Sequence, residues 1–157
     1  MKRYIKQRVF SWRDRFSVLD EQGNPCYYVE GELFSLGKRL HVWNSQGEEV
    51  LTIVQKPWRL LLTYQVSIGG NPMGEIRKEF TILFSKYVWS ALGLTADGKF
   101  LGHEYAISRG NRKVADLSKA YMSWGDSYEL EVGFPGDELA ALAMVLAIDC
   151  ALAADNG

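Results

Sequence analysis

The residues of this chain that could perform catalytic chemistry are few and widely spaced. The 157 residues include two histidines, His41 and His103, and two cysteines, Cys26 and Cys150. These four residues do not have the spacing of zinc ligands, and the sequence pairs no nucleophile with a base. His103 directly precedes Glu104, and neighbours on a strand face opposite sides, which argues against an acid–base pair. The motifs of serine hydrolases, nucleotide-binding loops and zinc proteases are also absent from the sequence. We therefore expect no enzymatic activity, no cofactor and no metal site.

Basic residues are the second group that could contribute a function, because Lys and Arg attract anionic lipid headgroups. Residues 1–15 contain six basic residues and one acid, with aromatic residues interleaved, whereas residues 125–157 contain seven acids and no Lys or Arg. Further basic residues adjoin turn glycines. The simpler interpretation is that a basic strand lies beside acidic ones and that exposed Lys and Arg keep edges and turns soluble. The candidate lipid-binding residues are Lys2, Arg3, Lys6, Arg8, Lys38, Arg39, Arg109, Arg112 and Lys113.

The element that must organise these residues is at the C-terminus. Residues 139–154 are apolar on every side, with Asp149 as their one charged residue. A helix that is apolar all round has to be enclosed by protein. We predict this helix over about residues 137–154, with the acids of Asp137-Glu138 at the positive end of its dipole. We expect Asp149 near the mouth of the enclosing barrel, accepting hydrogen bonds in a structural role rather than acting as a functional acid.

The apolar run also has to be weighed as a membrane anchor. It covers 16 residues, is rich in alanine and has no flanking Lys or Arg. A helix that crosses a bilayer needs roughly 20 apolar residues, and a carboxylate inside it is costly. We therefore predict burial in protein and no transmembrane span.

The segments before residue 135 have the pattern of short strands separated by turns. Alternation over residues 39–43 breaks at residues 44–47, and apolar runs predict strands at residues 60–68 and 80–89. About 137 residues at roughly 11 per strand and turn give about twelve strands. A barrel of that size is too wide for its own side chains to fill, but a helix roughly 10–12 Å across fits inside. We predict a mainly β fold in one domain, residues 1–157: an antiparallel barrel of about twelve strands enclosing the hydrophobic C-terminal helix.

Four segments, in their order along the chain, resemble the LURP-one-related family of the Tubby C-terminal-like superfamily, which also includes phospholipid scramblases. The resemblance rests on residues 28–40, 47–56, 126–132 and 143–149 and extends over nearly the whole chain. It implies a twelve-stranded barrel around a C-terminal helix. It also implies an anionic lipid as the ligand class, because Tubby domains bind phosphoinositides through basic surface residues. The chain lacks the Cys-rich stretch and added transmembrane extension of scramblases, so we do not expect scramblase activity.

Composition narrows the remaining functions. The net charge is −1 and 47% of the residues are hydrophobic, which excludes a disordered chain and disfavours nucleic-acid binding. Two cysteines far apart in sequence and no apolar leader are typical of a cytoplasmic protein. We expect a non-enzymatic intracellular barrel, peripheral to membranes if it binds anionic phospholipid or phosphoinositide, and otherwise bound to a protein partner. The sequence leaves two alternatives open, a carrier of a small apolar ligand inside the barrel and a protein-interaction scaffold.

Overall fold

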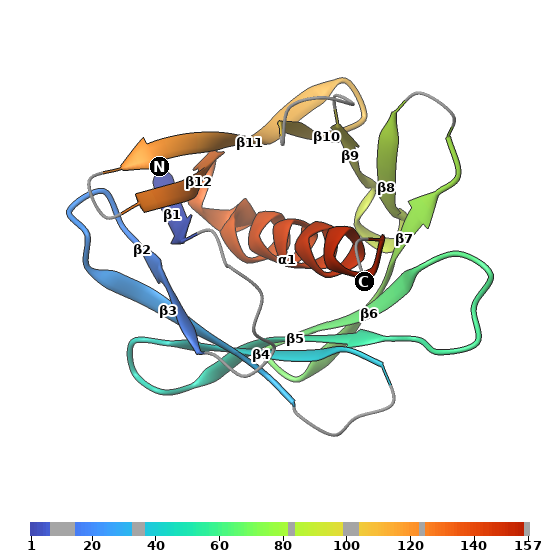
Figure 1. Cartoon of the computed structure of the whole chain (residues 1–157), viewed down its shortest axis with the longest axis horizontal. Helices are drawn as coiled ribbons and strands as arrows, with labels where there is room; N and C mark the ends of the chain where they lie inside the picture. The colour runs from blue at the N-terminus through green and yellow to red at the C-terminus, as the bar shows by residue number, and fades with distance from the viewer. Residues whose placement is uncertain (7–14, 33–36, 82–83, 99–103, 123–124, 156–157) are drawn as a thin grey trace.

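The fold is a closed antiparallel barrel around one helix, as the sequence predicts (Figure 1). In the described part of the chain, twelve strands each pair with their neighbours in sequence, and β12 closes the ring by pairing with β1. The computed structural model describes residues 1–6, 15–32, 37–81, 84–98, 104–122 and 125–155. The strands are β1 (Lys2–Lys6), β2 (Phe16–Leu19), β3 (Pro25–Gly31), β4 (Arg39–Asn44), β5 (Glu49–Gln55), β6 (Thr63–Ile68), β7 (Asn71–Glu79), β8 (Ser85–Trp89), β9 (Leu94–Gly98), β10 (Tyr105–Arg109), β11 (Arg112–Met122) and β12 (Gly125–Val132).

Side-chain alternation along the strands creates the two faces of the wall. In β5, Leu51 and Ile53 point into the barrel and are buried, while Thr52 and Val54, which alternate with them, are partly exposed. Successive side chains on a strand face opposite sides, so a polar–apolar pattern of period two gives one buried face. The inner faces of the strands therefore line a space that only another apolar element can fill.

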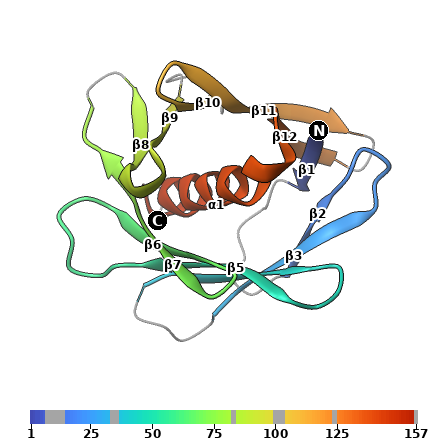
Figure 2. The ribbon, with the colours of Figure 1, turned by 180° about the vertical axis from the view of Figure 1, so that it is seen from behind.

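That element is α1 (Glu138–Asp155), which runs through the ring in both views (Figures 1 and 2). It follows the short 3₁₀ turn η2 (Pro135–Asp137), so the helix begins and ends one residue later than predicted. Ala140 to Ile148 are all buried. The helix packs against β5, β6, β7, β11 and β12, and its small alanines allow the strands to approach it closely.

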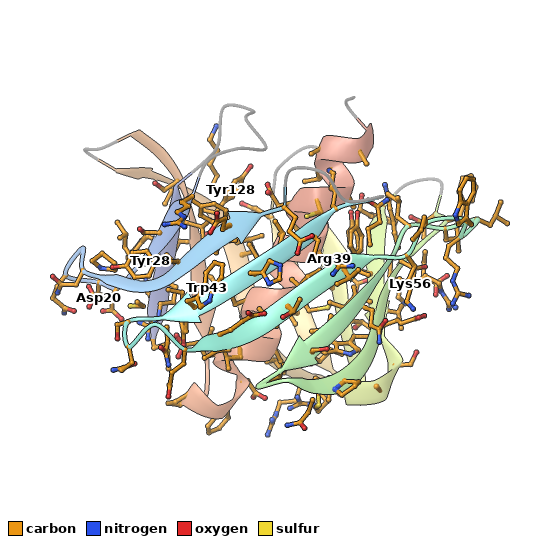
Figure 3. All side chains as sticks on the ribbon, turned by 90° about the horizontal axis from the view of Figure 1, so that it is seen from below. Asp20, Tyr28, Arg39, Trp43, Lys56 and Tyr128 are labelled. Atoms are coloured by element: carbon orange, nitrogen blue, oxygen red, sulfur yellow. The ribbon has the colours of Figure 1, made fainter. Side chains whose placement is uncertain are left out.

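The barrel has two different ends. Because neighbouring strands are antiparallel, the odd-numbered strands all run toward the same end of the barrel. We call this the loop end, and it also holds the C-terminus of α1. The opposite turn end holds Met1, the connections that follow the even-numbered strands (which include the 3₁₀ turn η1, Ser90–Leu92) and the start of α1. Figure 3 labels one residue of each end, Asp20 of the turn end and Lys56 of the loop end, and shows α1 running from the bottom of the view to the top.

Candidate lipid-binding surface

Three of the predicted lipid-binding residues pair with acids at the start of α1. The Arg3 Nε atom lies 2.6 Å from Glu138 Oε1, and these side chains are only 19% and 12% exposed. Asp137 pairs with Arg109 at 3.1 Å and with Arg112 at 3.8 Å. Acids are favoured at the positive end of a helix dipole. The three arginines therefore tie the beginning of the helix to the barrel wall.

The remaining described members of the predicted set also have partners. Lys2 pairs with Glu129 at 2.8 Å, Lys113 pairs with Asp116, and Arg39 lies 3.6 Å from Glu32. The Lys38 ammonium donates a 2.6 Å hydrogen bond to the carbonyl oxygen of Cys150 in the last turns of α1. A cation at this position satisfies a helix carbonyl and suits the negative end of the dipole.

The structure does not bring the predicted lipid-binding residues together on one surface. The backbone of Lys6, together with Lys38 and Arg39, lies at the loop end, whereas Lys2, Arg3, Arg109, Arg112 and Lys113 lie at the turn end. The side chain of Lys6 and all of Arg8 lie outside the described residues, as does His103. Lipid binding by this set stays a prediction, but the structure gives most of its described members a second role in holding the fold.

Asp149 lies at the loop end of α1, near the mouth of the barrel. Asp149 is exposed rather than buried, so its carboxylate keeps most of its hydration. The cost of burying a charge, which is the reason to expect a structural role for Asp149, is therefore small. Asp149 borders a narrow pocket of about 30 Å³ with the apolar residues Phe16 and Leu152 and with Tyr105 and Tyr128. About 30 Å³ accommodates one or two water molecules.

His41 forms a charged cluster on the outer face of β4. Its Nε2 atom lies 2.8 Å from Glu32 Oε1, its Nδ1 atom lies 3.0 Å from Glu49 Oε1, and its ring stacks on Trp43 with centroids 5.8 Å apart. Burial of the ring opposes protonation, but hydrogen bonds to Glu49 and Glu32 outweigh it and raise the pKa of His41. The Thr52 hydroxyl donates a 2.6 Å hydrogen bond to the same Glu49 Oε1 atom, and the described residues hold no group of His, Cys, Asp and Glu that suits a metal ion.

The raised pKa of His41 predicts a pH-dependent contribution to stability. Its charged form stabilises the fold fully below the ordinary pKa of about 6.5, and this contribution is lost as the pH rises through the raised value. His41→Gln should therefore lower the free energy of unfolding at pH 6 but hardly at pH 8.5. The effect should stay below about 1 kcal/mol because both glutamates are exposed. Urea unfolding of both proteins at the two pH values checks this, and an equal difference at both values would contradict it.

Sequence reasoning missed the most unusual feature of the surface. Four large apolar side chains at the loop end, which we call the tip residues, are exposed to solvent: Trp58 at 93%, Leu60 at 101%, Phe80 at 85% and Phe84 at 59%. They belong to the β5–β6 and β7–β8 connections, which adjoin because β6 pairs with β7. The apolar runs predicted strands from residues 60 and 80, but β6 begins at Thr63 and β8 at Ser85. The predicted strands were therefore too long at their starts.

Two lysines flank the tip residues. Lys56 precedes Trp58 by two positions, and Lys86 follows Phe84 by two. Within the described part of the chain, neither lysine side chain has an ion-pair or hydrogen-bond partner. Glu79 lies opposite Lys86 in the strand register, but it pairs with Arg77 at 2.8 Å. The loop end thus combines exposed apolar side chains with unneutralised positive charge.

Comparison with known proteins identifies the family of this chain and a solved structure with the same fold. The model of the LURP-one-related family matches residues 1–149. This chain belongs to the LURP-one-related family. The uncharacterised protein YxjI of Bacillus subtilis (strain 168) is 35% identical over 153 residues, covering 98% of this chain and 94% of that protein. The X-ray structure of an Arabidopsis thaliana protein has the same fold, with a TM-score of 0.63 and 16% identity over 94% of this chain and 89% of that one.

Membership of the LURP-one-related family confirms the resemblance and the fold predicted from the sequence. The family match and the named relative carry no enzymatic description. Within the described residues, α1 does not reach the length and apolarity that a bilayer-crossing helix needs.

Proposed function

We propose that this LURP-one-related chain is a non-enzymatic barrel that binds anionic lipid headgroups at its loop end. The observation that carries the proposal is the difference, in the described part of the chain, between the cations that pair with carboxylates and those that do not. Most described members of the predicted set are held by carboxylates, whereas Lys56 and Lys86 have no partner among the described residues. Their charge can therefore act on an external anion without first losing an internal partner. The superfamily resemblance points to the same class of ligand.

The size of the electrostatic attraction is appropriate for reversible binding. A Lys or Arg near an anionic membrane surface contributes about 1 kcal/mol, and the attraction fades within a Debye length of the surface. Lys56 and Lys86 lie on neighbouring hairpins at one end of the barrel, so one flat surface can attract both. We expect binding that depends on the fraction of anionic lipid and weakens as the salt concentration rises.

The pocket beside α1 gives less support to a carrier of apolar ligands. Its lining is largely apolar and includes Ile5, Leu117 and Val145. Its volume of about 30 Å³ is far below the roughly 300–1,000 Å³ of small-molecule sites. The proposal therefore places the ligand outside the barrel rather than beside the helix.

Neutralising the two lysines should test the proposed function. We expect Lys56→Gln/Lys86→Gln to bind vesicles of phosphatidylcholine with phosphatidylserine about 30-fold more weakly, since about 2 kcal/mol is lost. Co-sedimentation at low and moderate salt measures this, with pure phosphatidylcholine vesicles as the reference.

The matched control removes the same charge from the opposite end of the barrel. Arg112→Gln/Lys113→Gln changes two exposed turn-end cations that already pair with Asp137 and Asp116. It should bind anionic vesicles like the wild type. Loss of binding in this control alone would refute the proposed location, and equal wild-type binding to neutral and anionic vesicles would refute the role of charge.

A further inference from the structure

We infer that the barrel docks end-on to a lipid bilayer, with Trp58, Leu60, Phe80 and Phe84 inserted at the boundary between headgroups and acyl chains. The inference rests on the proposed function and deepens it. Attraction of Lys56 and Lys86 by anionic headgroups would bring the barrel to the surface. Insertion of the tip residues would then hold it there through burial of apolar area, which salt does not screen.

The exposure of the tip residues is the first argument. Single exposed apolar residues are ordinary on protein surfaces, but a contiguous group marks a site of interaction with a protein, ligand or membrane. Trp58, Leu60 and Phe80 are each at least 85% exposed, so they contribute almost nothing to the core. Their side chains are therefore available to an external apolar phase.

The arrangement of the two connections is the second argument. The Lys78 amide donates a 2.9 Å hydrogen bond to the Leu62 carbonyl, and the Lys56 amide donates one of 2.8 Å to the Thr63 carbonyl. Both bonds extend the sheet pairing into the β5–β6 connection, and the first of them ties that connection to β7, the strand that Phe80 directly follows. Since the β5–β6 and β7–β8 connections both lie at the loop end, all four tip residues lie at the same end of the barrel.

The backbone at Trp58 is the third argument. Its φ angle of 67° lies in the left-handed region, and Trp58 is the one described residue other than glycine with a positive φ. A bulky residue rarely adopts this conformation, which is unfavourable and recurs at functional sites. Here the strained backbone presents a fully exposed indole, which core packing does not explain.

The chemistry of the surface favours a bilayer over a protein partner. Trp is enriched at membrane–water interfaces, and Trp, Phe and Leu beside Lys or Arg are typical of segments that lie in the headgroup region. Lys56 and Lys86, without partners among the described residues, complement anionic headgroups around the inserted side chains. In this orientation the C-terminus of α1 and Asp149 also face the membrane, while the acids at the start of the helix face away.

Trp58 provides the test, because it is one of the tip residues and is fluorescent. Vesicles of phosphatidylcholine and phosphatidylserine that carry bromine on their acyl chains should quench part of the wild-type tryptophan emission. The chain contains five tryptophans, so the contribution of Trp58 is read as the quenching lost in Trp58→Phe, which keeps an apolar side chain. Leu60→Ala/Phe80→Ala should weaken binding by about 100-fold, or tenfold for each lost side chain.

Phe134→Ala is the matched control, because Phe134 is 59% exposed at the turn end. It should bind and be quenched like the wild type. Failure of the wild type to bind any vesicle would overturn the proposed function and the inference together. Binding without quenching from Trp58, or unchanged binding of Leu60→Ala/Phe80→Ala, would overturn the inference alone. A wild-type dimer that these two substitutions dissociate, measured by sedimentation, would assign the tip residues to a contact between copies and would also overturn it.

Discussion

Leu142→Ala should lower the free energy of unfolding by about 3 kcal/mol, a value within the range for a buried leucine. Leu142 lies on α1 inside the barrel and is 1% exposed. Truncation removes buried apolar area and leaves a cavity, because a closed wall of paired strands cannot collapse freely onto the helix. In a chain of this length the loss corresponds to a melting temperature lower by about 6–12 °C.

Leu60→Ala is the matched control, because it makes the same chemical change at a side chain that is fully exposed. It should leave the free energy of unfolding within about 0.5 kcal/mol of the wild type. Urea unfolding followed by far-ultraviolet circular dichroism measures both variants. If Leu142→Ala were as stable as Leu60→Ala, the helix would not be enclosed in solution. Comparing the two variants distinguishes a leucine that stabilises the core from a leucine that is exposed and available to a membrane.

The fold could be predicted because its main constraint is local in the sequence. Residues 139–154 are apolar in every direction, so the helix had to be surrounded, and the turn signals before them set the number of strands. The boundaries at Leu60 and Phe80 could not be predicted in this way. An apolar run has the same composition whether it faces a core or solvent, and the end of a strand is set by where its hydrogen-bonding partner ends.

The roles of the basic residues depended on contacts that no local pattern contains. Arg3 and Glu138 are 135 positions apart, and only closure of the barrel by β1 and β12 brings them together. Composition correctly showed basic and acidic segments at opposite ends of the chain. It could not show that Arg3 would be held by an acid while Lys56, outside the basic segment, would have no partner in the described residues.

Breaking the pair between Arg3 and Glu138 should cost about 2 kcal/mol of unfolding free energy in either single variant. The atoms are 2.6 Å apart and both side chains are largely buried, so removing one charge leaves the other desolvated without a counter-ion. Glu138 also lies in the first turn of α1, where a carboxylate interacts favourably with the helix dipole. Arg3→Gln and Glu138→Gln should therefore each destabilise, and the double variant should cost less than their sum.

The same variants distinguish the two roles open to Arg3. If it anchors the helix, Arg3→Gln should lose stability in urea but, while folded, bind anionic vesicles like the wild type. If instead it binds lipid, its vesicle affinity should fall about fivefold, because one lysine or arginine near the surface contributes about 1 kcal/mol. In that case the double-mutant cycle with Glu138→Gln should show no coupling in stability. We expect coupling of about 1–2 kcal/mol and unchanged binding, because an arginine already committed to a buried carboxylate must break that pair before it can reach a headgroup.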